Sequence, residues 1–307
     1  MDEVLFDRYG RLGLVTLNRP KAMNALTHGM VLAMEARLDA WADDPGIAVV
    51  AIRGAGDRAF AAGGDIRTLY DQGREDGRRN FAFFNDEYRL NTKIKRYPKP
   101  YVALMDGIVM GGGVGVSVHG TRRIAGDRTV FAMPETGIGL FPDVGGTFFL
   151  PRLPGETGMW LALTGARLKT ADVVACGICD LHVASERTGD LIDALSRLDA
   201  GERTLDAVDE VLAACRAAPR GEAVRDTHAE RIDRCFGAGS VEAILAALEA
   251  DGSDWAGTQR AAILTKSPSS TRIAFRQLRE GAGLEFEDCM ALEYRLARWC
   301  MTHPDFY

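Results

Sequence analysis

Residues 98–154 read PKPYVALMDGIVMGGGVGVSVHGTRRIAGDRTVFAMPETGIGLFPDVGGTFFLPRLP and contain most of the residues that point to chemistry. The apolar run 101–104 follows Pro100, as is typical of a buried strand. Three consecutive glycines then occupy positions 111–113. Glycine permits positive φ and close approach of a ligand to the main chain, so the pattern predicts N–H groups presented at a helix N-terminus. Such donors can hold a developing negative charge.

Two carboxylates in the same stretch are candidates for acid and base chemistry. Glu135 follows Pro134 and Asp143 follows Pro142, and both lie among Met, Ile, Leu and Phe. Partial burial would raise the pKa of a carboxyl group towards the range that acid/base catalysis uses. A solvated loop or a helix cap explains the same residues, so from the residues alone both interpretations stand.

The overall composition predicts an ordinary soluble globular protein with one large domain or two modest ones. The 307 residues are 47% apolar and 26% charged, with a formal net charge of −6. This net charge gives no excess of basic residues that would favour binding to nucleic acid. No apolar run approaches the ~20 residues of a membrane span. The first residues lack the basic and apolar regions of a signal peptide, so we predict a cytoplasmic location and neither a nucleic-acid nor a membrane partner.

The six cysteines are scattered among apolar or helical positions. Cys176 and Cys179 form a C-x-x-C without a second pair or a histidine cluster nearby. A redox or zinc role is the alternative to the reduced core residues that we predict. No motif demands a metal, and we expect no cofactor.

Secondary-structure signals divide the chain into two parts. The pattern of residues 4–18 predicts a β-hairpin, and Thr27 is predicted to be the N-cap of a helix. Residues 60–65 are a second place where glycine exposes backbone N–H donors. Strand-then-helix units recur through the first half, which predicts an α/β core over residues 1–187. Strands become scarce beyond it, which predicts a helical C-terminal portion over residues 188–307. The helices expected there cover residues 205–217, 241–250, 254–265, 270–280 and 285–301.

Several motifs resemble the crotonase (enoyl-CoA hydratase/isomerase) superfamily, and the resemblance covers nearly the whole chain. These motifs are Ala22-Met23-Asn24-Ala25-Leu26, Phe60-Ala61-Ala62-Gly63-Gly64-Asp65, Asp106-Gly107 with the glycine triplet, Pro134-Glu135, and Leu163-Thr164-Gly165 with Ala171 and Gly177. Residues 87–91, 133–146 and 293–296 are similar to the 3-hydroxyisobutyryl-CoA hydrolases within that superfamily. The resemblance implies a crotonase-like spiral of repeated ββα units, and trimers are usual among such proteins.

The resemblance also implies roles for individual residues. The backbone N–H groups of Gly64 and Gly112 form one oxyanion hole for a thioester carbonyl oxygen. Glu135 and Asp143 are assigned to catalysis, and Glu87 and Gly112 join them in substrate contact. The partner is a small acyl-CoA, with coenzyme A as part of the substrate.

The remaining polar residues near these motifs carry weaker expectations. Arg19, Lys21, Arg58 and Arg67 lie close to the motifs that would surround the coenzyme A phosphates, although each alone reads as a solvated surface charge. His119 follows the glycine stretch, and we interpret it as a structural residue.

One position separates hydration from hydrolysis. Hydratases of the superfamily use two glutamates, one in the Pro-Glu motif and one two residues after the glycine triplet. The second position here is Gly115, and Asp143 stands where hydratases commonly have a small residue. We therefore predict hydrolysis of 3-hydroxyisobutyryl-CoA or a close short β-hydroxyacyl-CoA, in valine breakdown. The alternatives are an enoyl-CoA hydratase/isomerase and a non-catalytic acyl-CoA-binding homologue.

Overall fold

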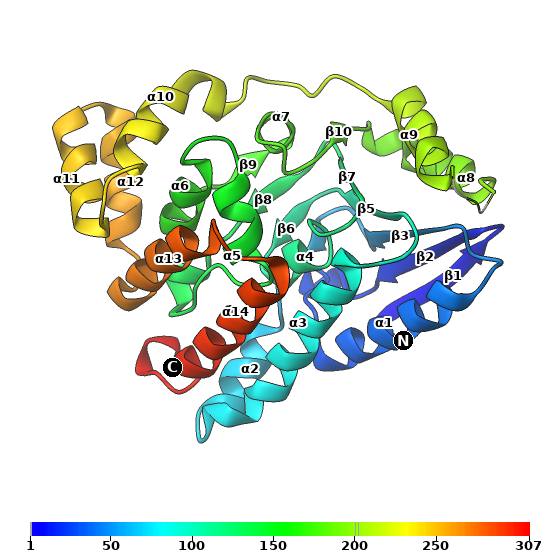
Figure 1. Cartoon of the computed structure of the whole chain (residues 1–307), viewed down its shortest axis with the longest axis horizontal. Coiled ribbons are helices and arrows are strands. Elements are labelled where there is room, and N and C mark those ends of the chain that lie inside the picture. The colour runs from blue at the N-terminus through cyan, green and yellow to red at the C-terminus, as the bar shows by residue number, and fades with distance from the viewer. Residues whose placement is uncertain (1, 200, 202) are drawn as a thin grey trace.

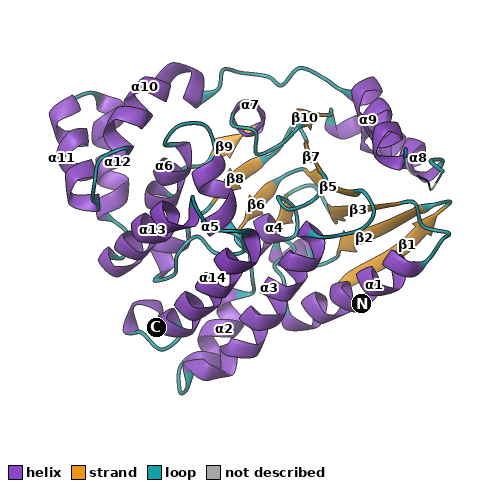
Figure 2. Cartoon of the chain, in the orientation of Figure 1, coloured by secondary structure: helices purple, strands orange, loops and turns teal. Residues whose placement is uncertain are grey.

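The protein is built from two β-sheets that are enclosed by helices (Figure 2), and successive strands in the middle of the sequence alternate between the two sheets. The structure, a computed structural model, describes residues 2–199, 201 and 203–307. From β4 to β8 each strand lies in the sheet to which the preceding strand does not belong. This alternation is the predicted spiral, and the α/β fold class is confirmed.

The larger sheet has the order β1-β2-β3-β5-β7-β10, in which β1 and β2 form the predicted antiparallel hairpin and the other neighbours are parallel. The smaller sheet has the order β4-β6-β8-β9, with only the β8–β9 pair antiparallel. The strands are β1 Val4–Tyr9, β2 Leu12–Leu17, β3 Val49–Gly54, β4 Ala59–Ala61, β5 Tyr101–Met105, β6 Ile108–Met110, β7 Arg122–Ala125, β8 Val130–Ala132, β9 Leu168–Lys169 and β10 Leu181–His182.

Helices cover both faces of the larger sheet, which explains why β2 is buried along its whole length. Val15 and Leu17 face the main core, to which α1 (His28–Asp43) and α3 (Phe81–Lys95) also contribute. Leu12 and Leu14 face the opposite side, where α8 (Thr188–Ser196) and α9 (Thr204–Cys215) pack. The helical portion therefore begins by closing the outer face of the sheet.

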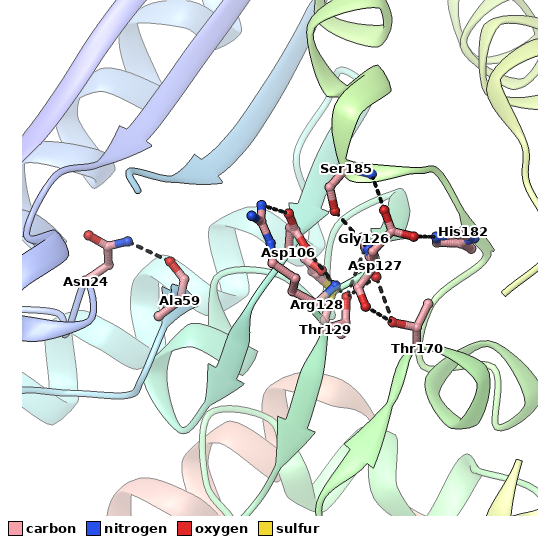
Figure 3. Close-up of polar contacts among 11 residues, drawn as sticks. Asn24, Ala59, Asp106, Gly126, Asp127, Arg128, Thr129, Thr170, His182 and Ser185 are labelled. Carbon is pink, nitrogen blue, oxygen red and sulfur yellow. Dashed lines mark hydrogen bonds and ion pairs between the residues drawn. The ribbon is translucent and has the colours of Figure 1, made fainter. Parts of the chain in front are cut away.

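Polar contacts hold the loops at the carboxyl ends of the strands (Figure 3). The Asn24 side chain donates to Ala55 O at 2.9 Å and to Ala59 O at 2.8 Å, which ties the Ala22–Leu26 motif to the loop before β4. Asp127 accepts from the Ser185 N–H at 2.8 Å and lies 2.9 Å from His182 Nε2. These contacts position loops and do not enter the cavity described below.

The last two helices return to the first half of the chain. Figure 1 shows α14 lying beside α3, and it also packs against α5, whereas α13 packs against α6. The remaining helices are α2 Ile66–Gly73, α4 Gly112–Gly115, α5 Gly146–Phe149, α6 Thr157–Thr164, α7 Thr170–Ala175, α10 Val224–Phe236, α11 Val241–Asp251, α12 Asp254–Leu264, α13 Pro268–Gly281 and α14 Phe286–Cys300.

The helical C-terminal portion is confirmed, and all five helices expected there are present within a few residues. Two helices of this C-terminal portion were not predicted, α8 and α10. The division into domains at residue 187 stays a prediction. Within residues 2–199, 201 and 203–307, no helix is long and apolar enough to cross a membrane.

Candidate active site

A narrow cavity of about 70 Å³ brings together Gly64, Glu87, Gly112, Glu135 and Asp143. These are all the residues predicted for catalysis, the oxyanion hole and substrate contact. The cavity has an apolar wall contributed by Ile66, Leu69, Phe83, Phe84, Ile138 and Leu140. A short acyl group would therefore meet apolar carbon on one side and carboxyl and amide groups on the other.

Two backbone N–H groups face this cavity from separate turns of the spiral. Leu26 N donates to Gly63 O at 2.8 Å and Asp65 N donates to Leu26 O at 2.9 Å, which leaves the Gly64 N–H directed away from this bridge. Gly112 begins α4, where the first N–H groups have no partner within the helix. Gly111 makes the turn before it at φ 48°, ψ −125°, a conformation that a side chain would strain.

The two glycines lie close enough to act on one oxygen atom. A Cβ added to Gly112 would lie 3.3 Å from Gly64 N and 2.5 Å from Glu87 Oε1. Within the described residues, neither amide donates to a protein acceptor. The geometry of the predicted oxyanion hole is therefore present, while its role stays a prediction.

We expect Gly112→Ala to slow thioester turnover by roughly 10- to 100-fold, because the added methyl group displaces Glu87 or shifts the Gly112 amide. This loss is smaller than the loss caused by deletion of an oxyanion-hole donor, since the amide itself is still present. Steady-state thiol release gives the rate, and thermal unfolding checks the fold. Gly137→Ala is the matched control, because its Cβ would approach no atom closer than 3.7 Å. Unchanged turnover in Gly112→Ala would remove this amide from the site.

Glu135 is held against the glycine turn with its carboxyl group unpaired. It begins a short 3-10 turn, Glu135–Ile138, and is only 4% exposed. A Cβ added to Gly111 would lie 3.5 Å from its Oε1. Neither carboxyl oxygen has a hydrogen-bond partner in the described part of the chain. Burial and the charge of Asp143 raise the pKa of Glu135 well above its usual value, so it is a strong base once ionised.

Asp143 reaches the same cavity from the loop before α5. It is 6% exposed, and Tyr88 Oη on α3 donates to Asp143 Oδ2 at 2.7 Å. Burial raises the pKa of Asp143 to about 6, although the Tyr88 hydrogen bond favours the ionised form. Near neutral pH Asp143 can therefore both accept and release a proton.

Asp143 should lower stability wherever it is ionised. Its pKa rises on folding from 3.8 to about 6, so its contribution is most favourable below pH 3.8 and is lost as the pH rises through 6. We expect Asp143→Asn to raise the free energy of unfolding at pH 8 by on the order of 1–3 kcal/mol. That gain should shrink as the pH falls through 6. Denaturant titrations of both proteins at pH 8 and pH 5 measure the gain in the free energy of unfolding. A gain that does not depend on pH would contradict this role of the Asp143 pKa.

Glu87 lies on the buried face of α3, one turn before Asn91. It is 2% exposed, so its carboxyl group is buried. Burial, followed by the charges of Asp143 and Glu293, raises the pKa of Glu87 well above its usual value. This shift favours the protonated carboxyl group, which can donate a hydrogen bond within the cavity.

No room exists for a side chain at position 115, where hydratases of the superfamily carry their second glutamate. A Cβ on Gly115 would lie 2.7 Å from both Asn91 Nδ2 and Val144 Cβ. Both neighbours are buried. A second catalytic glutamate could not occupy this position without rearrangement of α3 and the Asp143 loop.

The cationic residues predicted near coenzyme A differ in whether they form ion pairs with acidic side chains. Arg19 is paired with Glu3 at 3.0 Å and Asp65 at 2.9 Å, and Arg67 is paired with Asp71. Lys21 and Arg58 are exposed and have no ion pair among the described residues. Their contact with coenzyme A phosphates stays a prediction.

His119 and the cysteines lie outside the cavity lining. His119 is buried, its Nε2 donates to Val144 O at 2.7 Å, and burial lowers its pKa to about 4. It is thus a neutral donor that holds the Asp143 loop, consistent with the structural interpretation. The six cysteines are buried free thiols.

Sequence reasoning missed two residues that contact the Asp143 loop. Tyr88 entered the sequence analysis only within the motif at residues 87–91, although its hydroxyl group contacts Asp143. Glu293 on α14 is fully buried and accepts hydrogen bonds from two amides of the loop. A signal for Glu293 existed, because it interrupts a buried stripe formed by residues 286, 289, 290, 297 and 300.

The family model "Enoyl-CoA hydratase/isomerase" matches residues 12–307. A curated relative from Xenopus tropicalis, named 3-hydroxyisobutyryl-CoA hydrolase, mitochondrial, is 48% identical over 99% of this chain and 80% of its own length. The human protein of the same name is 42% identical over 100% of this chain and 80% of its own length.

Solved structures support the same assignment. A carnitinyl-CoA dehydratase from Mycobacterium thermoresistibile superposes with a TM-score of 0.93 at 42% identity, covering 100% of this chain and 88% of that protein. An enoyl-CoA hydratase from Rhodobacter sphaeroides gives a TM-score of 0.88 at 38% identity, covering 99% and 87%. The chain therefore belongs to the enoyl-CoA hydratase/isomerase (crotonase) family.

Proposed function

We propose that this chain hydrolyses the thioester of 3-hydroxyisobutyryl-CoA, or of a close short β-hydroxyacyl-CoA, to the free acid and coenzyme A. One observation carries the proposal: the unpaired amides of Gly64 and Gly112 face the same cavity as the buried acids Glu135 and Asp143. The names of the curated relatives support the substrate, and through it a place in valine breakdown.

The site residues divide the reaction between them. The two amides stabilise the oxygen of the tetrahedral intermediate, where negative charge develops. Glu135 either activates water or attacks the carbonyl carbon itself, which expels the thiolate and forms a mixed anhydride that water then cleaves. Asp143, with a pKa of about 6, orients the water or protonates the departing thiolate.

The titles of the two solved structures name dehydration and hydration, and those activities are said of those proteins. In this chain, the space at Gly115 is closed by Asn91 and Val144. Placing one water across a C=C bond with two glutamates would need a carboxylate at that position. The geometry therefore favours hydrolysis.

A comparison of substrates tests the proposal. We expect thiol release from 3-hydroxyisobutyryl-CoA to exceed release from isobutyryl-CoA, which lacks the hydroxyl group that the Glu87 carboxyl group in the cavity can bind. A site built to bind a hydroxyl group discriminates strongly against the analogue without it. Equal rates would remove the hydroxyl group from the specificity, and the absence of thiol release from both would overturn the proposed reaction.

Isotope labelling separates the two chemical routes. In a single turnover in ¹⁸O-water, label found in the Glu135 carboxyl group supports the mixed anhydride. Label found in the product acid alone fits direct attack by water and equally an anhydride that water cleaves at its acyl carbon, so only label in Glu135 decides between the routes. Mass spectrometry of the peptide that contains Glu135 reads the difference.

The cytoplasmic location stays a prediction, and so does a homo-oligomer, for which the trimer is the usual form in the superfamily. The curated relatives carry the word mitochondrial in their names. Lys21 and Arg58 are the cations that we propose for the coenzyme A phosphates, because both are exposed and near the cavity loops.

A further inference from the structure

A buried carboxylate outside the proposed chemistry lies against the loop that carries Asp143. Glu293 comes from α14, nearly half the chain away in sequence, and its side chain is 0% exposed. Burial and the charge of Asp143 raise its pKa to about 8, and no cation within 4 Å among the described residues compensates it. Burial of an acid without a cation is costly, which argues for a specific task.

The contacts of Glu293 are two short hydrogen bonds to backbone amides of one turn. Glu293 Oε2 accepts from Gly145 N at 2.8 Å, and Oε1 accepts from Thr147 N at 2.8 Å. Gly145 is the N-cap of α5 and has no side chain to cap the helix. Glu293 therefore supplies from another helix the oxygen atoms that an N-cap side chain would supply locally.

The turn needs such support because its backbone is strained. Val144 has φ 50° and Gly145 has φ 89°, so two successive residues are left-handed and one of them is β-branched. The left-handed conformation is costly for a β-branched residue such as Val144 and persists only where the surroundings hold it. Two other side chains also hold the turn: His119 donates to Val144 O, and Gln277 Nε2 donates to Pro142 O at 2.7 Å.

The turn in this conformation places the Asp143 carboxyl group. Tyr88 fixes Oδ2, while the backbone on the C-terminal side of Asp143 is fixed through the amides that Glu293 binds. We propose that Glu293 is a positioning residue, which holds the Val144–Gly145 turn so that Asp143 meets the thioester in the reactive geometry. This inference rests on the proposed function, because it gives Asp143 a part in thiol release.

Glu293→Gln tests the inference with little change in shape. The amide NH₂ group would face one of the two backbone N–H donors, so one hydrogen bond is replaced by a donor–donor contact. We expect kcat for thiol release to fall by roughly 10- to 100-fold, as for a displaced catalytic group, and KM to change by less than about threefold. Glu293→Asp, one methylene shorter, should behave alike and serves if Glu293→Gln does not fold.

A double-mutant cycle with Asp143→Asn separates an effect of Glu293 on the position of Asp143 from a general loss of structure. If Glu293 acts through Asp143, Glu293→Gln should cost less than about twofold in the Asp143→Asn background. Met290→Ala is the matched control: Met290 is buried on the same helix, and no hydrogen bond of its side chain to the turn is found in the described residues. Its effect should be equal in both backgrounds.

Each result decides the question. A loss from Glu293→Gln that appears only while Asp143 is intact supports the inference. An equal loss in both backgrounds, or no loss at all, overturns it. Full activity of Asp143→Asn with Glu293 intact would instead overturn the part that the proposed function gives to Asp143, and that single variant makes the two failures distinguishable.

Discussion

Glu135→Gln is expected to reduce thiol release by about 10³-fold or more, because an amide can neither attack a thioester nor take a proton from water. The change should leave the fold intact, since neither carboxyl oxygen of Glu135 has a hydrogen-bond partner in the described residues. Removing a buried acid with a raised pKa should even stabilise the protein at high pH.

Single-turnover thiol release and thermal unfolding measure the two effects. Glu249→Gln is the matched control, since Glu249 pairs at the surface with Arg260. If Glu135→Gln kept the rate of the unchanged protein, Glu135 would be excluded as base and as nucleophile, and the proposed mechanism would be wrong.

The second large effect is expected of Asp143→Asn, with kcat reduced by roughly 10²-fold, the contribution of one acid or base. The Asn Oδ1 can still accept the hydrogen bond from Tyr88, so the side chain should keep its place. What is lost is the exchange of a proton near neutral pH, which the pKa of about 6 permits.

This variant should therefore be slower and, at pH 8, more stable than the unchanged protein. Asp209→Asn, which alters a half-buried pair with Arg122 outside the cavity, controls for loss of an aspartate charge. Lower stability together with lower activity would indicate that Asp143 serves the fold and not the reaction.

Local patterns in the sequence predicted much of the fold. The hairpin and the Thr27 cap depend on short-range chemistry, and the structure shows both. Helix α10 was missed because residues 224–236 are polar nearly all round, with three residues buried at its C-terminal end. Helix α8 is short, and its Leu191, Ile192 and Leu195 face a sheet that no local pattern identifies.

The site, like the fold, was predicted from the sequence only in part. The positions of Glu135 and Asp143 beside prolines in apolar sequence marked them as candidates. The meeting of Gly64 with Gly112 followed from the family resemblance, because spacing along the chain says nothing of two turns of a spiral. The contacts of Asp143 with Tyr88 and of its loop with Glu293 join three distant elements. They depend on how α3 and α14 pack, which no single stretch of sequence encodes.

The most direct test of the central claim is a side-by-side assay of the unchanged protein: thiol release from 3-hydroxyisobutyryl-CoA and water addition to crotonyl-CoA, at equal enzyme concentration. The closed space at Gly115 and the acid pair Glu135 and Asp143 predict fast thiol release and little or no water addition. Water addition without thiol release would contradict the account and identify the chain as a hydratase.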